Sequence, residues 1–153
     1  MVEFLPGALS VQESRALIDR IEAHFEEHGF GLWALELPGE AALIGWTGLA
    51  RVDPQMPFAP AVEIGWRLAR PYWGRGLATE AASAVASYAF DQLALGSLVS
   101  FTARGNERSR RVMERLGMHR VSSGDFRHPS LPAGHELAEH VLYRLDATYW
   151  RIR

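Results

Sequence analysis

Residues 62–81 read VEIGWRLARPYWGRGLATEA. Apolar and polar residues alternate over the first seven positions, which predicts a strand that we place at Ala61–Leu68. Gly74 and Gly76 follow, and they allow a tight turn because glycine has no Cβ and readily adopts a positive φ. A helix rich in alanine then runs to about Leu95. A strand, a glycine-rich turn and a helix in this order predict a protein that mixes α and β structure.

The flanking sequence predicts further helices and strands. A capping box at Ser10 begins a helix that ends at Gly29. The other predicted features, in chain order, are a strand at Gly31–Leu37, a turn at Pro38–Glu40, a strand at Ala42–Leu49, a loop at Asp53–Pro60, a helix cap at Gly96, a strand at Leu98–Ala103, a helix from Asn106 to Gly117, a strand at Met118–Ser122, a loop at Asp125–Glu139 and a strand at His140–Leu145. We therefore expect a mixed-sheet α/β protein in one domain, residues 1–153.

Composition excludes several chemistries. The chain has no cysteine, so disulfides, thiolate catalysis and cysteine-ligated zinc are excluded. All 16 basic residues are arginine, which also excludes a catalytic lysine and a Walker A phosphate loop. The formal net charge of -2 gives no support for a nucleic-acid or membrane partner. With neither a signal peptide nor a long apolar run in the sequence, we expect a cytoplasmic protein.

The glycine-rich turn predicts an anion site. The first turn of a helix has unpaired N–H groups and the positive end of the helix dipole, which together suit a phosphate. A dinucleotide fingerprint would need a third glycine, but position 79 is threonine. Coenzyme A is the remaining common ligand of this geometry, and the alternative is a helix entry with no ligand.

Two ordered motifs resemble those of the GNAT superfamily of N-acetyltransferases, and more closely its RimJ/RimL-type members. The first comprises Glu63–Leu68 and Trp73–Ala81, the second Asn106–Ser109 and Val112–Met118, and the resemblance covers about residues 10–146. It implies a mixed, mostly antiparallel sheet flanked by helices, of α+β type. It also implies acetyl-CoA as cosubstrate and a primary amine, on a peptide or protein N-terminus or a small molecule, as acceptor. Without cysteine, we expect direct attack in a ternary complex.

The resemblance assigns residues to the cofactor. Asn106 would hydrogen-bond the cofactor or an ordered water, and it is also a suitable helix cap. Ser109 and Met113 would lie beside the same ligand. The pantetheine arm would pair with the backbone of Trp66, Arg67 and Leu68 like an added strand. The pyrophosphate would meet the loop and helix start made by Trp73, Gly74, Arg75, Gly76, Leu77, Ala78 and Thr79.

Three residues are candidates for catalysis. Glu63 is our first choice as general base, acting through water, and the alternative role is a structural ion pair. Ser109 is the candidate acid, because Met113 stands where many family members have tyrosine. Its alternative role is a local hydrogen bond within the helix, with water protonating the thiolate. His140 is expected near the acceptor amine as a base or binding group, or else on the surface.

Other side chains leave alternatives open. The spacing of His128, His135 and His140 fits no helical ligand pair, so we expect no metal. The aromatic residues Trp33, Trp46, Phe58 and Trp66 belong either to the core or to the wall of the acceptor pocket.

The start of the chain departs from the family pattern. RimJ/RimL-like proteins have a strand and a helix before the region that matches Met1–Gly7, and we expect both to be missing. Another segment or chain, such as the second copy in a homodimer, would then cover the sheet edge. This motivates two alternative functions: a non-catalytic module that binds coenzyme A, and an interaction domain that uses the free edge. A hydrolase is set aside because no Gly-x-Ser-x-Gly occurs.

Overall fold

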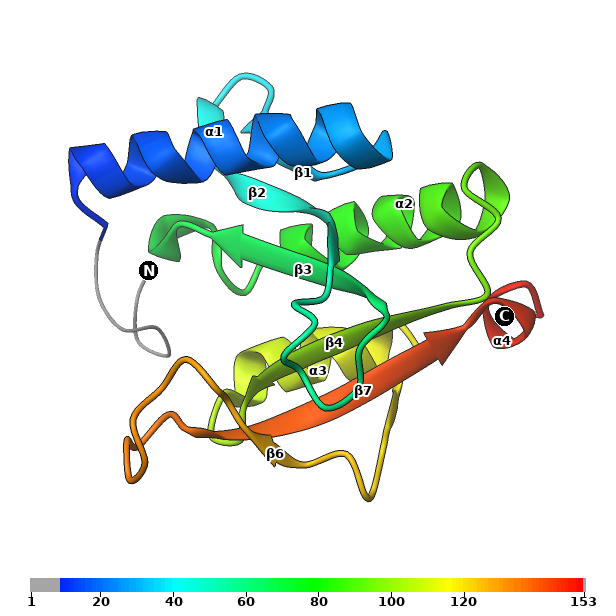
Figure 1. The fold of residues 1–153 in the computed structure, drawn as a ribbon. Helices are drawn as coiled ribbons and strands as arrows, with labels where there is room; N and C mark the ends of the chain where they lie inside the picture. Colours follow the sequence, from blue (N-terminus) through cyan, green and yellow to red (C-terminus); the bar gives the residue numbers. More distant parts are fainter. Residues whose placement is uncertain (1–8, 153) are drawn as a thin grey trace.

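The structure, a computed structural model, describes residues 9–152 and contains a seven-stranded sheet (Figure 1). Its strand order is β1-β2-β3-β4-β7-β5, with β6 paired to β7, and only the β3–β4 pair is parallel. The predicted mixed, mostly antiparallel sheet is therefore confirmed. The elements are α1 (Val11–His28), β1 (Leu32–Leu37), β2 (Ala41–Arg51), β3 (Val62–Leu68), the 3₁₀ turn η1 (Arg70–Tyr72), α2 (Leu77–Asp91), β4 (Ser97–Ala103), α3 (Glu107–Arg115), β5 (His119–Arg120), β6 (Phe126–Arg127), β7 (Glu139–Asp146) and α4 (Ala147–Trp150).

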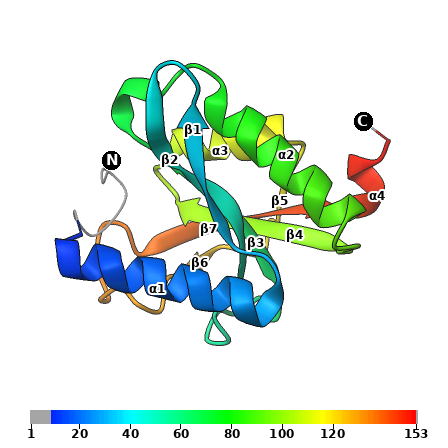
Figure 2. The same ribbon diagram turned by 90° about the horizontal axis from the view of Figure 1, so that it is seen from above.

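Helices lie on both faces of the sheet. Figure 2 shows α1 on one side and α2 and α3 on the other. Three alanines of α2, Ala82, Ala86 and Ala89, are fully buried, and their small side chains let the helix lie close to the strands. The main core forms between the helices α2 and α3 and the face of the sheet that they cover. A second apolar cluster, which includes Val99 and Phe126, lies on the opposite face.

The first helix begins and ends as predicted. The Ser10 hydroxyl accepts a hydrogen bond from the Glu13 N–H (3.2 Å), and the Ser10 N–H donates to the Glu13 carboxylate (2.7 Å). Both bonds of the capping box are therefore present. At the other end Gly29 adopts a left-handed conformation, with φ 75°, which suits glycine.

The end of α2 differs from the prediction. The helix stops at Asp91 with Gln92 as its cap, four residues before Leu95, and Gly96 does not cap it. Ala94 adopts the left-handed conformation (φ 51°) that we expected of a glycine. The Leu95 N–H then bonds the Ala89 carbonyl and closes the turn. The alanine-rich composition predicted the helix correctly but gave no signal for where it ends.

The C-terminal third also differs from the prediction. The strand expected at Met118–Ser122 is only β5, and the loop expected at Asp125–Glu139 contains β6, which pairs with the start of β7. The helix α4 was not predicted. These short elements form because β7 offers backbone partners far away in the sequence, which no local pattern reveals. The expectation of a missing first strand and helix concerns Met1–Gly7, which lie outside the described residues.

The sheet opens between β3 and β4. Strand β3 pairs with β2 from Val62 to Leu68, but it pairs with β4 only at Glu63, opposite Val99. In an antiparallel pair, alternate residues point their N–H and C=O groups away from the partner strand. Beyond Glu63 these groups of β3 therefore face a gap where a neighbouring strand would otherwise lie.

Candidate active site

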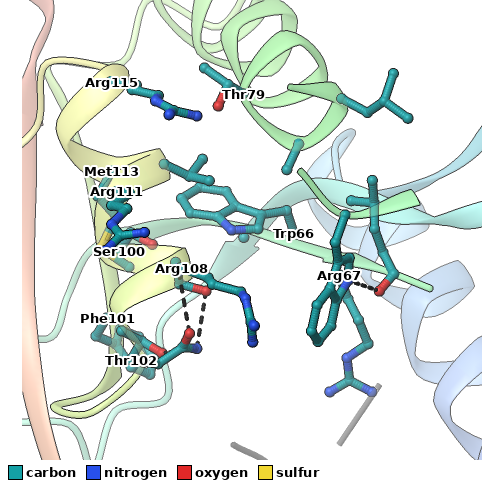
Figure 3. Close-up of a pocket in the computed structure, with 18 of the residues that line it drawn as sticks. Trp66, Arg67, Thr79, Ser100, Phe101, Thr102, Arg108, Arg111, Met113 and Arg115 are labelled. Carbon is teal, nitrogen blue, oxygen red and sulfur yellow. Dashed lines mark hydrogen bonds between the residues drawn. The ribbon is translucent and has the colours of Figure 1, made fainter. Parts of the chain in front are cut away.

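A cleft of about 540 Å³ occupies the gap between β3 and β4. Its walls are the two diverging strands, the loop before α2, the start of α2, and one side of α3 (Figure 3). His128 and His140, from the C-terminal part of the chain, complete the lining of the cleft. Most residues that the sequence assigned to cofactor or catalysis line this cleft: Glu63, Trp66, Arg67, Leu68, Trp73, Gly74, Gly76, Leu77, Ala78, Thr79, Asn106, Ser109, Met113 and His140.

The loop before α2 forms an open cradle. Gly74 and Gly76 have φ values of 75° and 80°, a region that side chains other than glycine rarely adopt. A Cβ placed at either glycine would meet no protein atom within 4 Å, so space beside the loop is free for a ligand. In contrast to α1 and α3, the start of α2 has no side-chain cap. Its first N–H groups are therefore available to an anion such as a pyrophosphate.

Two side chains hold this loop in place. The Trp73 indole donates a hydrogen bond to the Leu68 carbonyl (2.8 Å) and ties the loop to the end of β3. Arg75 makes a two-pronged ion pair with Glu40 in the β1–β2 turn, at 2.7 and 2.8 Å. The Arg75 side chain therefore turns away from the cleft, and a ligand would meet only its backbone.

Arginines give the cleft a positive wall. Arg108, Arg111 and Arg115 line it from α3, and Arg67 lines it from β3. The three on α3 follow each other at spacings of three and four, which places them on one helix face. This spacing is visible in the sequence, but the prediction did not use it. Of the described residues that line the cleft, Glu63 is the only one with an acidic side chain.

Glu63 lies at the point where β3 and β4 part. Its side chain is partly buried, and among residues 9–152 it has neither a hydrogen-bond donor nor an ion-pair partner. The alternative role of a structural ion pair therefore does not apply within this range. Burial disfavours the charged carboxylate and raises the pKa of Glu63 to about 7. At neutral pH such a group can both accept and release a proton.

Asn106 and Ser109 form a small hydrogen-bonded unit with Thr102. The Asn106 amide donates to the Thr102 hydroxyl (2.9 Å) and to the Ser109 hydroxyl (3.1 Å), and its oxygen accepts the Ser109 N–H (3.2 Å). Asn106 thus caps α3, and both its N–H donors are used within the protein. Because the Ser109 hydroxyl accepts a bond from Asn106, its own proton remains available for a ligand.

His140 and His128 come together at the cleft, with ring centroids 5.0 Å apart. The His140 Nδ1 lies 3.2 Å from the Ala138 carbonyl. Burial lowers the pKa of both rings, which favours neutral imidazoles at pH 7. The pairing of β6 with β7 brings these residues together, so His128 could not be placed here from sequence spacing.

The three histidines His128, His135 and His140 do not all lie together. His135 does not line the cleft, and its Nδ1 accepts the Leu137 N–H. Within the described range, no group of three or more His, Cys, Asp or Glu residues is arranged to hold a metal ion. In the same range no helix has the length and apolar character to cross a membrane.

The structure separates the four aromatic residues. Trp46 and Trp66 line the cleft. Trp33 instead packs edge-on against Tyr88 of α2, and Phe58 joins the second apolar cluster. Trp46 and Trp66 are therefore pocket walls, with Trp66 also packed against the main core, whereas Trp33 and Phe58 belong to packing alone.

Comparison with known proteins gives one family. Residues 1–119 match the family model described as the acetyltransferase (GNAT) domain. The chain is 33% identical to YnaD of Bacillus subtilis, an uncharacterized N-acetyltransferase, over 98% of this chain and 82% of that protein. It is 32% identical to the FsC-acetyl coenzyme A-N(2)-transacetylase of Aspergillus fumigatus, over 80% of this chain and 52% of that protein. The chain thus spans about half the length of the fungal relative.

A solved structure has the same fold. The acetyltransferase from Agrobacterium tumefaciens superposes with a TM-score of 0.69 at 28% identity, covering 91% of this chain and 74% of that one.

Proposed function

Because the chain belongs to the GNAT acetyltransferase family, we propose that it transfers the acetyl group of acetyl-CoA to a primary amine within a ternary complex. The observation that carries this proposal is the open cleft, with an uncapped helix start at one wall and a free strand edge at another. We further propose that residues 1–153 form one acetyltransferase domain. The Trp73–Ala81 motif supports a RimJ/RimL-like subfamily within it.

The cleft supplies the contacts that coenzyme A needs. The N–H groups of Leu77, Ala78 and Thr79 bind the pyrophosphate, beside the free space at Gly74 and Gly76. The α3 arginines add positive charge on the same side. The unpaired backbone of β3 from Trp66 to Leu68 accepts the pantetheine arm as an added strand.

The cleft also supplies groups for the chemistry. Attack of the amine nitrogen on the thioester carbonyl forms a C–N bond and breaks the C–S bond, so one proton leaves the amine and one joins the thiolate. Glu63 takes the first proton through water, since its raised pKa matches a base that works near neutral pH. Ser109 donates a hydrogen bond to the leaving thiolate, and water supplies the proton that the thiolate takes up. His140 and its neighbour His128 border the acceptor side.

A thermal-shift titration tests the cofactor. Acetyl-CoA is expected to raise the melting temperature progressively, because a ligand that binds only the folded state stabilises it. Gly76→Glu places a negative side chain in the cradle and is expected to abolish this shift.

Gly134→Glu is the matched control. Gly134 also has a positive φ (84°) and an open Cβ position, but it lies outside the cleft lining. Both variants therefore carry similar backbone strain, and only Gly76→Glu should lose the acetyl-CoA response. If the wild-type protein shows no shift at millimolar acetyl-CoA, the proposal fails.

A further inference from the structure

Arg67 differs from the other arginines of the cleft. It extends from β3, whereas Arg108, Arg111 and Arg115 extend from α3. In Figure 3 its side chain points away from Thr79 and Arg115. Alternate residues of a strand face opposite sides of the sheet, so Arg67 shares its side with Glu63 rather than with Trp66, which packs against the main core. The face of Arg67 is therefore the face of the candidate base.

Within the described part of the chain, the guanidinium of Arg67 has no anionic partner. Among residues 9–152 it makes no hydrogen bond or ion pair, and its one specific contact is with the Trp46 ring, 5.5 Å from the ring centroid. The side chain is partly buried, and desolvation lowers the pKa of Arg67. A cation removed from water without a partner is costly, and an anionic ligand would offset this cost.

Between Arg67 and Glu63 this face of the strand carries no side chain, and the Trp46 ring lies beside it. Position 65 on the same face is glycine, whose Cβ would lie 3.6 Å from the Trp46 ring and 3.8 Å from the Glu63 carboxylate. The Trp46 ring thus borders both the base and the cation. A ligand in this part of the cleft can contact the two charged groups at once, along one aromatic wall.

From this arrangement we propose that the acceptor carries a carboxylate in addition to its amine, and that Arg67 binds the carboxylate while Glu63 faces the amine. The inference rests on the proposed acetyl transfer and names the acceptor class: amino acids or short peptides with a free carboxylate. Arginine suits this role because its planar fork matches a carboxylate with two parallel hydrogen bonds.

Charge in the rest of the cleft favours the same class. Among residues 9–152, the lining holds four arginines and a single acidic residue, Glu63. The α3 arginines face the phosphates of coenzyme A in the proposed complex, so Arg67 is the arginine whose charge a polyamine acceptor would meet, and this opposes its binding. An acceptor that carries a carboxylate besides its amine brings one negative charge, which can pair with Arg67 on the acceptor side.

The experiment compares matched acceptors on the wild-type protein. CoA thiol release from acetyl-CoA is measured with ω-amino acids of three to six carbons and with n-alkylamines of equal length. A second set pairs dipeptides with their C-terminal amides. We expect kcat/KM to be roughly ten- to a hundredfold higher for the carboxylate member of a pair, as for hydrogen bonds to charged groups.

Variants assign the preference to Arg67. Arg67→Met keeps an apolar stem of similar length beside Trp46, and it is expected to bring the carboxylate acceptor down to the rate of its neutral partner. Arg67→Lys should retain part of the preference. Arg144→Met is the control, because Arg144 is exposed on β7, pairs with Asp146 and lies outside the cleft lining. It should behave like the wild type.

The outcomes separate the inference from the proposed function. Equal kcat/KM for both members of every pair in the wild type would overturn the carboxylate inference and leave acetyl transfer intact. A weaker acetyl-CoA thermal shift in Arg67→Met, with the acceptor preference unchanged, would identify Arg67 as a cofactor ligand and also overturn it. Thiol release at the blank rate with all amines would overturn the acetyl-transfer proposal and, with it, this inference.

Discussion

At the scale of single residues, Glu63 combines a raised pKa with a place on the cleft wall. If it is the base, kcat/KM should rise with pH up to about 7 and then level, because only the carboxylate accepts a proton. Glu63→Gln should lower kcat/KM by about 100-fold or more and remove this inflection. A pH–rate profile of both proteins measures the effect.

A second carboxylate serves as the control for that profile. Glu139 is exposed on β7 and pairs with Arg127, outside the cleft lining. Glu139→Gln should keep both the rate and the inflection of the wild type. If Glu63→Gln also keeps them, another group is the base.

The same pKa makes a prediction about stability. In the folded protein the pKa of Glu63 is about 7, against 4.5 for an unburied glutamate. Folding therefore favours the protonated form, and this contribution is fully present below about pH 4.5 and lost as the pH rises through 7. Relative to the wild type, Glu63→Gln should gain roughly 2–3 kcal/mol of unfolding free energy between pH 4.5 and pH 8. Urea unfolding at both pH values measures it, and a constant difference would contradict the assignment.

Residue types indicated some of the site, whereas tertiary pairing decided the rest. Gly74, Gly76 and Glu63 were predictable because their roles follow from backbone freedom or from position on a strand. His128 was not, because its approach to His140 depends on the β6–β7 register. The lack of an anionic partner for Arg67 among residues 9–152 was also not predictable, since it depends on which side chains the fold places around the guanidinium.

At the scale of elements, α3 depends on Asn106 for both its cap and the position of Ser109. Asn106→Ala should lower the unfolding free energy by about 1 kcal/mol, as loss of a helix cap does. It should also lower kcat, because the Ser109 hydroxyl loses its donor. Chemical denaturation and steady-state kinetics on the same samples separate the two effects.

The cap of α1 provides the comparison. Ser10→Ala removes an equivalent side-chain cap from a helix that does not line the cleft. It should cost a similar unfolding free energy but leave kcat unchanged. An equal fall in kcat in both variants would mean that Asn106 acts through stability alone.

Local signals fixed the beginnings of helices better than the ends of elements. The Ser10 capping box and the Gly76 turn are short-range features, and both helices start where they indicate. The end of α2 depends on Ala94, an alanine in a conformation that its residue type disfavours. The two-residue strands β5 and β6 exist because β7 pairs with them, and so no local pattern specified them.

At the scale of the whole molecule, the cofactor is expected to bridge the two parts of the sheet. Bound acetyl-CoA should protect backbone amides of β3 from hydrogen exchange, since it would fill the gap beyond Glu63. Amides at the outer edge of β1 should exchange at an unchanged rate and serve as the internal control. Hydrogen exchange measured by mass spectrometry tests this. Equal protection of β3 and β1 would contradict binding of the cofactor in the gap between β3 and β4.

The parting of β3 from β4 has a consequence for solubility. A continuous sheet has two unpaired edges. Because β3 and β4 separate, this sheet has two further unpaired edges, which face each other inside the molecule. Unpaired strand borders on a protein surface invite a strand of another chain and so promote aggregation. Here the inner pair lies within a cleft flanked by α2 and α3. The unpaired backbone groups of this gap are thus accessible to a small extended ligand but not to a strand of another polypeptide.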